Sequence, residues 1–202
     1  MNLLDLIISL AVLLYSVVIH EVMHAVVAEK MGDSTAREEG RITLNPIPHI
    51  DPMGSIILPL ILHLSGLPVF GAAKPVPVNY NRMSNPRLGM LLVSLAGPAS
   101  NLALAVLCVI PFKLGLINTL SAQVLSTAIG INLSLAVLNI LPIPPLDGSK
   151  VWLSFAPLSW IQAVFRYEMF GFLIVYVFAY TGLLGAILYP LFNGFLKLFG
   201  LN

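Results

Sequence analysis

Five apolar stretches alternate with polar segments along this chain of 202 residues. They cover residues 3–28, 55–67, 88–112, 124–141 and 169–188, and an apolar tail follows at 189–201. A helix needs about 20 residues to cross the hydrocarbon core of a bilayer, because each residue adds about 1.5 Å. The second stretch has only 13 residues and contains Pro59 and His63. We expect it to re-enter the membrane or to lie at the interface, and we expect the others to form helices.

The section between the first and third stretches is polar and rich in proline and glycine. Residues 37–44 are typical of a turn and a short strand, and residues 45–54 of a run of turns. Residues 74–80 read as a second extended piece, placed on a sheet edge because its prolines cannot donate to a ladder. The pattern therefore predicts a small β-hairpin or sheet element between the first two core helices.

Composition changes the class of protein that these helices belong to. Apolar residues make up 58% of the chain and charged residues 9%, whereas a soluble domain has about 25% charged residues. We therefore predict an all-α polytopic membrane protein with one domain over residues 1–202. About three core helices are expected, followed by one or two C-terminal helices. No Lys or Arg and no small-residue cleavage site precede His20, so we expect residues 1–19 to be a retained span.

Charge and cysteine usage exclude other classes. The net charge of +1 gives no support for nucleic-acid binding, and the single cysteine, Cys108, lies in an apolar run. A disulfide framework within the chain is thereby excluded, and Cys108 is interpreted as a small packing residue.

The first apolar stretch carries the chemistry. It contains the run His20-Glu21-Val22-Met23-His24. Histidines four residues apart lie on one face of a helix and can bind one metal ion, and the glutamate between them can act on a water molecule. Ionisable residues inside a membrane segment are costly and mark functional sites. The pattern predicts a metal site, and zinc fits the ligand types.

A catalytic zinc site usually has three protein ligands, so a third ligand is needed. The candidates outside the motif are His49, His63, Asp33, Asp51 and Asp147. Asp147 is favoured, because it follows an apolar helix that three prolines interrupt. Irregular backbone at membrane depth is tolerated where it lines a cavity, and a carboxylate there is well placed to bind metal.

This choice also tests the topology. The histidines lie towards the end of the first stretch, and Asp147 follows the fourth. The two ends meet only if the first and fourth helices run parallel, which requires that the short second stretch does not cross. The length of that stretch and the metal hypothesis therefore agree.

The distribution of basic residues then predicts orientation. With that topology, eight of the ten basic residues lie on the face of the metal site: Lys30, Arg37, Arg41, Lys74, Arg82, Arg87, Lys150 and Arg166. Lys113 lies on the other face, and Lys197 joins it if the tail stays there. By the positive-inside rule the site faces the cytoplasm. If the second stretch spans, the count is even and the rule favours neither face.

Together these residues resemble the site-2 protease family of intramembrane zinc metalloproteases. The resemblance rests on the histidine motif, on Asn45-Pro46, on residues 96–101 with the sequence AGPASN, and on the segment from Asn139 to Asp147-Gly148. It covers most of the chain and implies that His20, His24 and Asp147 bind one Zn²⁺ ion and that Glu21 is the catalytic acid/base. Unlike larger members of that family, the chain has no PDZ insert and no nucleotide-binding regulatory domain.

The resemblance also suggests further catalytic residues and a substrate. A hydrogen-bond donor besides zinc would stabilise the tetrahedral oxyanion; Asn139 is the first choice and Asn101 the second. An interhelical hydrogen bond is the alternative for either asparagine. The expected partners are transmembrane protein substrates and the lipid bilayer. A substrate helix must unwind, and the strand expected at residues 41–44 could offer an edge to it, although an ordinary structural hairpin explains that strand equally well.

Two other functions remain open from the residues alone. A metal transporter or metal sensor would explain buried His and Asp, but the chain shows no internal repeat and Glu21 would have no role. An inactive scaffold would be favoured by a missing ligand, and none is missing. His49 and Asp51 could gate access or bind zinc in a resting state, or serve as turn residues. The plasma membrane of a prokaryote and a homodimer are compatible with the sequence.

Overall fold

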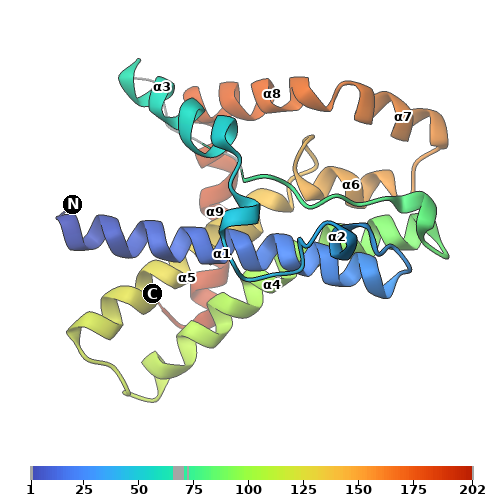
Figure 1. Ribbon diagram of the computed structural model, residues 1–202. Coiled ribbons are helices and arrows are strands. Elements are labelled where there is room, and N and C mark those ends of the chain that lie inside the picture. Colours follow the sequence, from blue (N-terminus) through green and yellow to red (C-terminus); the bar gives the residue numbers. More distant parts are fainter. Residues whose placement is uncertain (1, 66–70, 72, 202) are drawn as a thin grey trace.

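The computed structural model describes residues 2–65, 71 and 73–201, and its regular structure there is helical throughout (Figure 1). The longer helices are α1 Leu3–Lys30, α4 Pro86–Lys113, α5 Thr119–Asn139, α8 Glu168–Tyr180 and α9 Leu183–Phe199. The shorter ones are α2 Thr35–Glu38, η1 Ile47–His49, η2 Pro52–Ile57, α3 Leu58–Leu64, η3 Tyr80–Arg82, α6 Asp147–Leu153 and α7 Leu158–Arg166.

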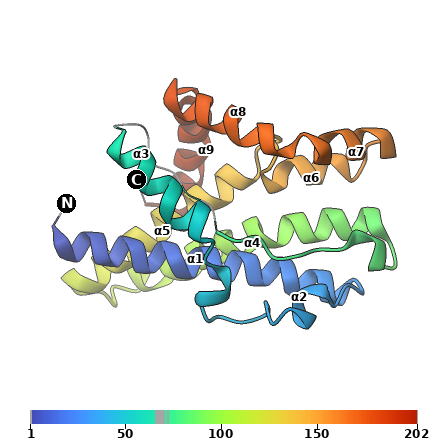
Figure 2. The same cartoon turned by 45° about the horizontal axis from the view of Figure 1, so that its top comes forward.

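Three of the described helices, α1, α4 and α5, are long and apolar enough to cross a membrane. Helices α1 and α5 run in the same direction and α4 runs against both (Figures 1 and 2). Helices α7 and α8 are bent by 69° and reach the length of a fourth span only as a pair, and α9 is a shorter apolar helix. Many large apolar side chains of α1, α8 and α9 are exposed, as a lipid environment requires.

Local sequence explains where the spans begin and end. Asn85 caps the start of α4 through its side chain, and Pro86 follows at the first helical position. Gly115, with a φ of 67°, ends the tight turn after α4. Asn118 then opens α5 with a capping box shared with Ser121. Five residues therefore reverse the chain and place α5 alongside α1 and α4.

A buried polar cluster joins the three spans. The side-chain amide of Asn101 on α4 donates to the carbonyl oxygen of Ser16 on α1 (3.2 Å) and to Oδ1 of Asn132 on α5 (2.8 Å). Asn132 in turn donates to the Ser16 hydroxyl at 2.9 Å. Such hydrogen bonds join helices where lipid offers no hydrophobic driving force between them. An apolar cluster of Ala105, Val109, Ile129 and Leu133 packs α4 on α5 nearby.

The second apolar stretch forms two short helices in sequence, η2 with six residues and α3 with seven. The two helices extend away from the three-helix core on the side of the N-terminal half of α1 (Figures 1 and 2). The stretch is shorter than a spanning helix, as its sequence length indicates.

The β-hairpin or sheet predicted for residues 37–44 and 74–80 was wrong, because the described residues contain no strand. Residues 35–38 form α2, and residues 73–79 are extended without a partner strand. The strand edge proposed at residues 41–44 is therefore absent too.

Side chains take the place of a ladder around residues 74–79. Arg41 donates to the carbonyl oxygens of Lys74 and Pro75, at 2.8 and 3.2 Å. The backbone N–H of Lys74 donates to the carbonyl oxygen of His49 at 2.9 Å. Asp33 accepts the N–H of Asn79 at 2.6 Å. Pro75 and Pro77 have no N–H, so a regular ladder would have gaps, and these contacts satisfy several of the other backbone groups instead.

Candidate active site

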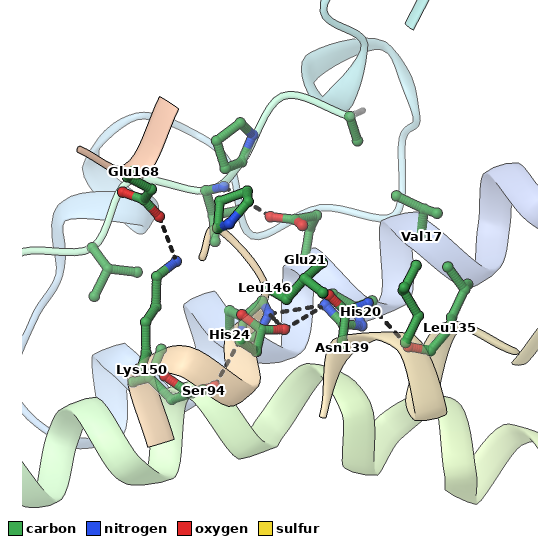
Figure 3. Close-up of a pocket in the computed structure, with 18 of the residues that line it drawn as sticks. Val17, His20, Glu21, His24, Ser94, Leu135, Asn139, Leu146, Lys150 and Glu168 are labelled. Atoms are coloured by element: carbon green, nitrogen blue, oxygen red, sulfur yellow. Dashed lines mark hydrogen bonds and ion pairs between the residues drawn. The ribbon is translucent and has the colours of Figure 1, made fainter. Parts of the chain in front are cut away.

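Two histidines and an aspartate from distant parts of the chain come together in the structure, and Figure 3 shows the two histidines side by side. His20 and His24 lie one turn apart on α1, and Asp147 begins α6 just after the end of α5. The Nε2 atoms of the histidines are 3.0 Å apart, and Oδ2 of Asp147 lies 3.1 Å from the first and 3.2 Å from the second. All three residues are buried.

Both imidazoles are held from behind through their other nitrogen. Nδ1 of His20 lies 2.6 Å from Oδ1 of Asn101, and Nδ1 of His24 lies 2.6 Å from the carbonyl oxygen of Val93. Both acceptors require Nδ1 to carry the proton, which leaves the lone pair on Nε2. This tautomer, fixed by a second layer of hydrogen bonds, is the one that histidine uses to bind metal.

The three facing atoms fit a zinc ion. In a tetrahedral site with bonds of about 2.0–2.1 Å, neighbouring ligand atoms lie about 3.3 Å apart. The observed separations of 3.0, 3.1 and 3.2 Å are close to that value. Among the described residues, this is the one group of three His, Cys, Asp or Glu side chains close enough to share an ion. Two neutral imidazoles and one carboxylate suit zinc chemistry.

Gly97 of α4 makes room for the two imidazoles. A Cβ atom at this position would lie 2.5 Å from Nε2 of His20 and 2.5 Å from Nε2 of His24. No side chain other than hydrogen fits beside the ligand atoms. Gly97 is thus part of the site, and its role is to leave the metal-facing nitrogens uncovered.

The corner that carries Asp147 is also built on close backbone approach. Residues 140–146 turn sharply after α5, and a Cβ atom at Gly148 would collide with the backbone of Ile140 and Leu141. From this corner, Oδ2 of Asp147 faces the Nε2 atoms of both histidines.

Glu21 lies beside the three ligand atoms and is positioned by main chain. Its Oε2 accepts the backbone N–H of Val76 at 2.9 Å (Figure 3). Val76 is buried against Ala25 and Ala36, so the extended segment that carries this N–H is fixed in place. The second carboxylate oxygen of Glu21 makes no hydrogen bond within the described part of the chain. A carboxylate held through one oxygen can exchange protons through the other.

These groups open into a cavity of about 640 Å³. Its walls are mostly apolar and come from α1, α4, α5, α8 and the extended segment. Asn139 lines it and donates one amide hydrogen to the carbonyl oxygen of Leu135 at 3.0 Å. Asn101 lies deeper, fully buried behind His20. Of the two asparagines proposed from the sequence, one faces the cavity and the other accepts a hydrogen bond from His20.

Four further polar residues line the cavity and were not identified from the sequence. Lys150 and Glu168 form an ion pair of 3.6 Å between α6 and α8, and Figure 3 shows it at one side of the cavity. Tyr80 and Ser94 also reach the cavity wall. No sequence pattern distinguishes them from interface residues, because only the folded chain brings them to the site.

The other candidate ligands lie elsewhere. Nε2 of His49 lies 3.0 Å from the carbonyl oxygen of Thr43, and Asp51 caps η2 by accepting the N–H of Gly54 at 2.8 Å. Asp33 accepts the backbone N–H of Asn79 and is therefore bonded away from the three facing residues. The side chain of His63 lies outside the described residues.

Comparison with known proteins supports the same chemistry. The model of "Peptidase family M50" matches residues 114–182, which include Asp147. The Bacillus subtilis protein named "Putative zinc metalloprotease YwhC" is 41% identical over 200 residues, covering 93% of this chain and 88% of that protein. The chain belongs to peptidase family M50. "Putative zinc metalloprotease Rip2" of Mycolicibacterium smegmatis is 33% identical, with coverage of 94% of this chain and 73% of the relative.

A third relative of this M50 peptidase comes from an archaeon. "Putative zinc metalloprotease MJ0611" of Methanocaldococcus jannaschii is 32% identical over 177 residues, covering 88% of this chain and 84% of the relative. No solved structure matches the chain. Family membership identifies the protein as a zinc metallopeptidase, and the three apolar helices identify it as a multi-pass membrane protein. The resemblance to site-2 proteases found in the sequence is confirmed.

Proposed function

We propose that this M50 peptidase hydrolyses peptide bonds in the transmembrane segments of other membrane proteins, as a step in regulated intramembrane proteolysis. The observation that carries the proposal is the position of the site. His20, His24 and Glu21 lie on a spanning helix, and the cavity in front of them is walled mainly by apolar side chains. A cavity of this kind accommodates an apolar peptide in an extended form better than a soluble polar one.

His20, His24 and Asp147 would hold the zinc ion, as their separations and tautomers support. When bound there, zinc would polarise a carbonyl oxygen and lower the pKa of a water molecule. The buried carboxylate of Asp147 offsets part of the ion's charge. The second layer formed by Asn101 and Val93 keeps both imidazole planes directed at the ion.

Glu21 would be the general base and then the general acid. The Val76 N–H holds Oε2, which leaves Oε1 to take a proton from the attacking water and to deliver it to the leaving amine. A carboxylate held in place lowers the entropic cost of reaching the reactive geometry, because the proton donor and acceptor are already aligned.

Asn139 would stabilise the oxyanion, and Asn101 would position His20. Asn139 lines the cavity and uses one amide hydrogen for Leu135, so its second amide hydrogen is available to a substrate. Asn101 is fully buried, and its amide nitrogen already donates to Ser16 and Asn132. The geometry thus favours Asn139 over Asn101 as the oxyanion donor, which is the same ranking that the sequence suggests.

The active site would face the cytoplasm, in the plasma membrane of a prokaryotic cell. Lys30, Arg82 and Arg87 lie together where α1 ends and α4 begins. Lys113 lies at the opposite end of α4, close to Gly200, which caps the end of α9. The basic residues are therefore unequally divided between the two ends of the bundle, which by the positive-inside rule favours a cytoplasmic site.

The test is cleavage in vesicles of defined orientation. Purified protein would be reconstituted with a panel of single-span substrates, and the products mapped by mass spectrometry for the wild type and for Glu21→Gln. We expect cleavage inside the apolar segment by the wild type and none by the variant. Cleavage confined to aqueous loops, or equal cleavage by the variant, would reject the proposal.

A further inference from the structure

The hydroxyl of Ser94 is buried at the wall of the cavity. Ser94 is 1% exposed, lines the cavity, and its Oγ has no partner of hydrogen-bond geometry among the described residues. Buried polar groups in folded proteins are nearly always paired, because an unpaired one destabilises the fold. An unpaired hydroxyl at the wall of an active-site cavity therefore indicates a group that a ligand completes.

Tyr80 supplies a second hydroxyl at the same place. Tyr80 packs against the cluster of Ala28, Met83 and Val93, the neighbour of Ser94, and it also lines the cavity. Burial raises the pKa of Tyr80 to about 12, while the nearby Ser94 hydroxyl acts in the opposite direction. The phenol therefore keeps its proton at physiological pH and is a hydrogen-bond donor.

The pair has a defined position relative to the metal ligands. Val93 accepts the hydrogen bond of His24, so Ser94 and Tyr80 lie on the His24 side. Figure 3 shows Ser94 on that side with Lys150, and Asn139 with Leu135 on the His20 side. The cavity therefore has polar side chains on both sides of the proposed metal site, and the rest of its lining is mostly apolar.

We propose that Ser94 and Tyr80 form a subsite that binds the main chain of the unwound substrate on the His24 side of the scissile bond. The inference rests on the proposed function. A segment that unwinds exposes N–H and C=O groups, and each must be bonded again where water is scarce. A serine hydroxyl accepts from an N–H or donates to a carbonyl, and the tyrosine hydroxyl donates to a carbonyl. Such a subsite recognises backbone and tolerates many sequences.

The test compares kcat/KM for the wild type, Ser94→Ala, Tyr80→Phe and the double variant on two substrates of unrelated sequence. Loss of one hydrogen bond to substrate corresponds to a decrease of roughly 3- to 10-fold. We expect each single variant to show it on both substrates, and the double variant to lose less than the product because the two groups act together. Zinc content should stay at the wild-type value.

The stability of Ser94→Ala separates binding from structure. The change removes an unpaired hydroxyl, so the variant should unfold at the same temperature as the wild type or at a higher one while cleaving more slowly. Ser154→Ala is the matched control, because Ser154 is buried, bonds to Val151 and lies outside the cavity lining. It should leave kcat/KM unchanged.

The outcomes distinguish failure of the Ser94–Tyr80 subsite from failure of the proposed protease function. Wild-type kcat/KM in both single variants would overturn the subsite and leave the protease intact. Loss of zinc or of folded protein in Ser94→Ala would make Tyr80→Phe, which leaves α4 unchanged, the deciding variant. Failure of the wild type to cleave any substrate, with zinc bound, would reject the proposed function and the subsite with it.

Discussion

Oδ1 of Asn101 lies 2.6 Å from Nδ1 of His20, and the same asparagine ties α4 to α1 and α5. One side chain thus connects the packing of the three spans to the orientation of His20, a proposed zinc ligand. Packing of the three helices therefore sets the tautomer and ring plane of His20, and we expect the proposed metal site to depend on that packing.

Asn101→Ala should therefore weaken zinc binding more than it weakens the fold. Loss of such a supporting hydrogen bond typically lowers metal affinity by about 10- to 100-fold. Zinc affinity would be measured by competition with a chelator. Asn139→Ala is the comparison: it should keep wild-type zinc affinity and lose activity. Equal zinc affinity in Asn101→Ala and the wild type would contradict the positioning role.

Gly97→Ala should abolish zinc binding. The added methyl group would lie 2.5 Å from both metal-facing nitrogens, where it displaces the imidazoles. Metal content per chain, measured by atomic spectroscopy, reports this directly. Gly194→Ala on α9 is the control, since its Cβ would enter open space. A Gly97→Ala protein with one bound zinc would show that α4 can move away from the site.

Val76→Pro should impair catalysis while zinc stays bound. Proline removes the N–H that holds Glu21, so the carboxylate loses its fixed position, at a cost of roughly 10- to 100-fold in kcat. Val76→Ala keeps the N–H and controls for the lost side chain. If the two variants had the same kcat, the hydrogen bond would have no part in positioning Glu21.

Asp33 should stabilise the turn after α1 in a pH-dependent way. Burial raises the pKa of its carboxyl, but hydrogen bonds from Thr35 and from the N–H of Asn79 lower it further, and the net pKa is below 3.8. A lowered pKa in the folded state contributes stability above pH 3.8 that is lost as the pH falls through the folded pKa.

Asp33→Ala is therefore expected to lower the free energy of unfolding in detergent by at least about 2 kcal/mol at pH 7. Thermal unfolding would follow the difference from the wild type as the pH is lowered, and the difference should shrink below about pH 4. Glu39→Ala, at an exposed position, should leave stability unchanged. A difference that does not change with pH would contradict an ionised Asp33.

The membrane helices and the meeting of His20, His24 and Asp147 could be predicted because both depend on local patterns. Stretches of apolar residues define α1, α4 and α5, and the spacing of His20 and His24 follows from helix geometry. Asp147 could be chosen because a broken helix end supplies a carboxylate where the topology needs one. The structure brings these three residues together.

The polar section could not be predicted, because distant side chains satisfy its backbone. Val76 and Asn79 bond to Glu21 and Asp33, which lie about 50 positions earlier in the chain. No local pattern reveals such partners, and the turn residues and prolines of this section indicated short strands. Ser94 and Tyr80 were missed for the same reason: their position at the cavity depends on how α4 packs against the extended segment.

The most direct test measures zinc content and cleavage together for the wild type, Glu21→Gln and Asp147→Ala. The account predicts one zinc per chain and cleavage in the wild type, full zinc without cleavage in Glu21→Gln, and weakened zinc with no cleavage in Asp147→Ala. Cleavage by Glu21→Gln at the wild-type rate, or unchanged zinc affinity in Asp147→Ala, would contradict the assignment of the general base or of the third ligand.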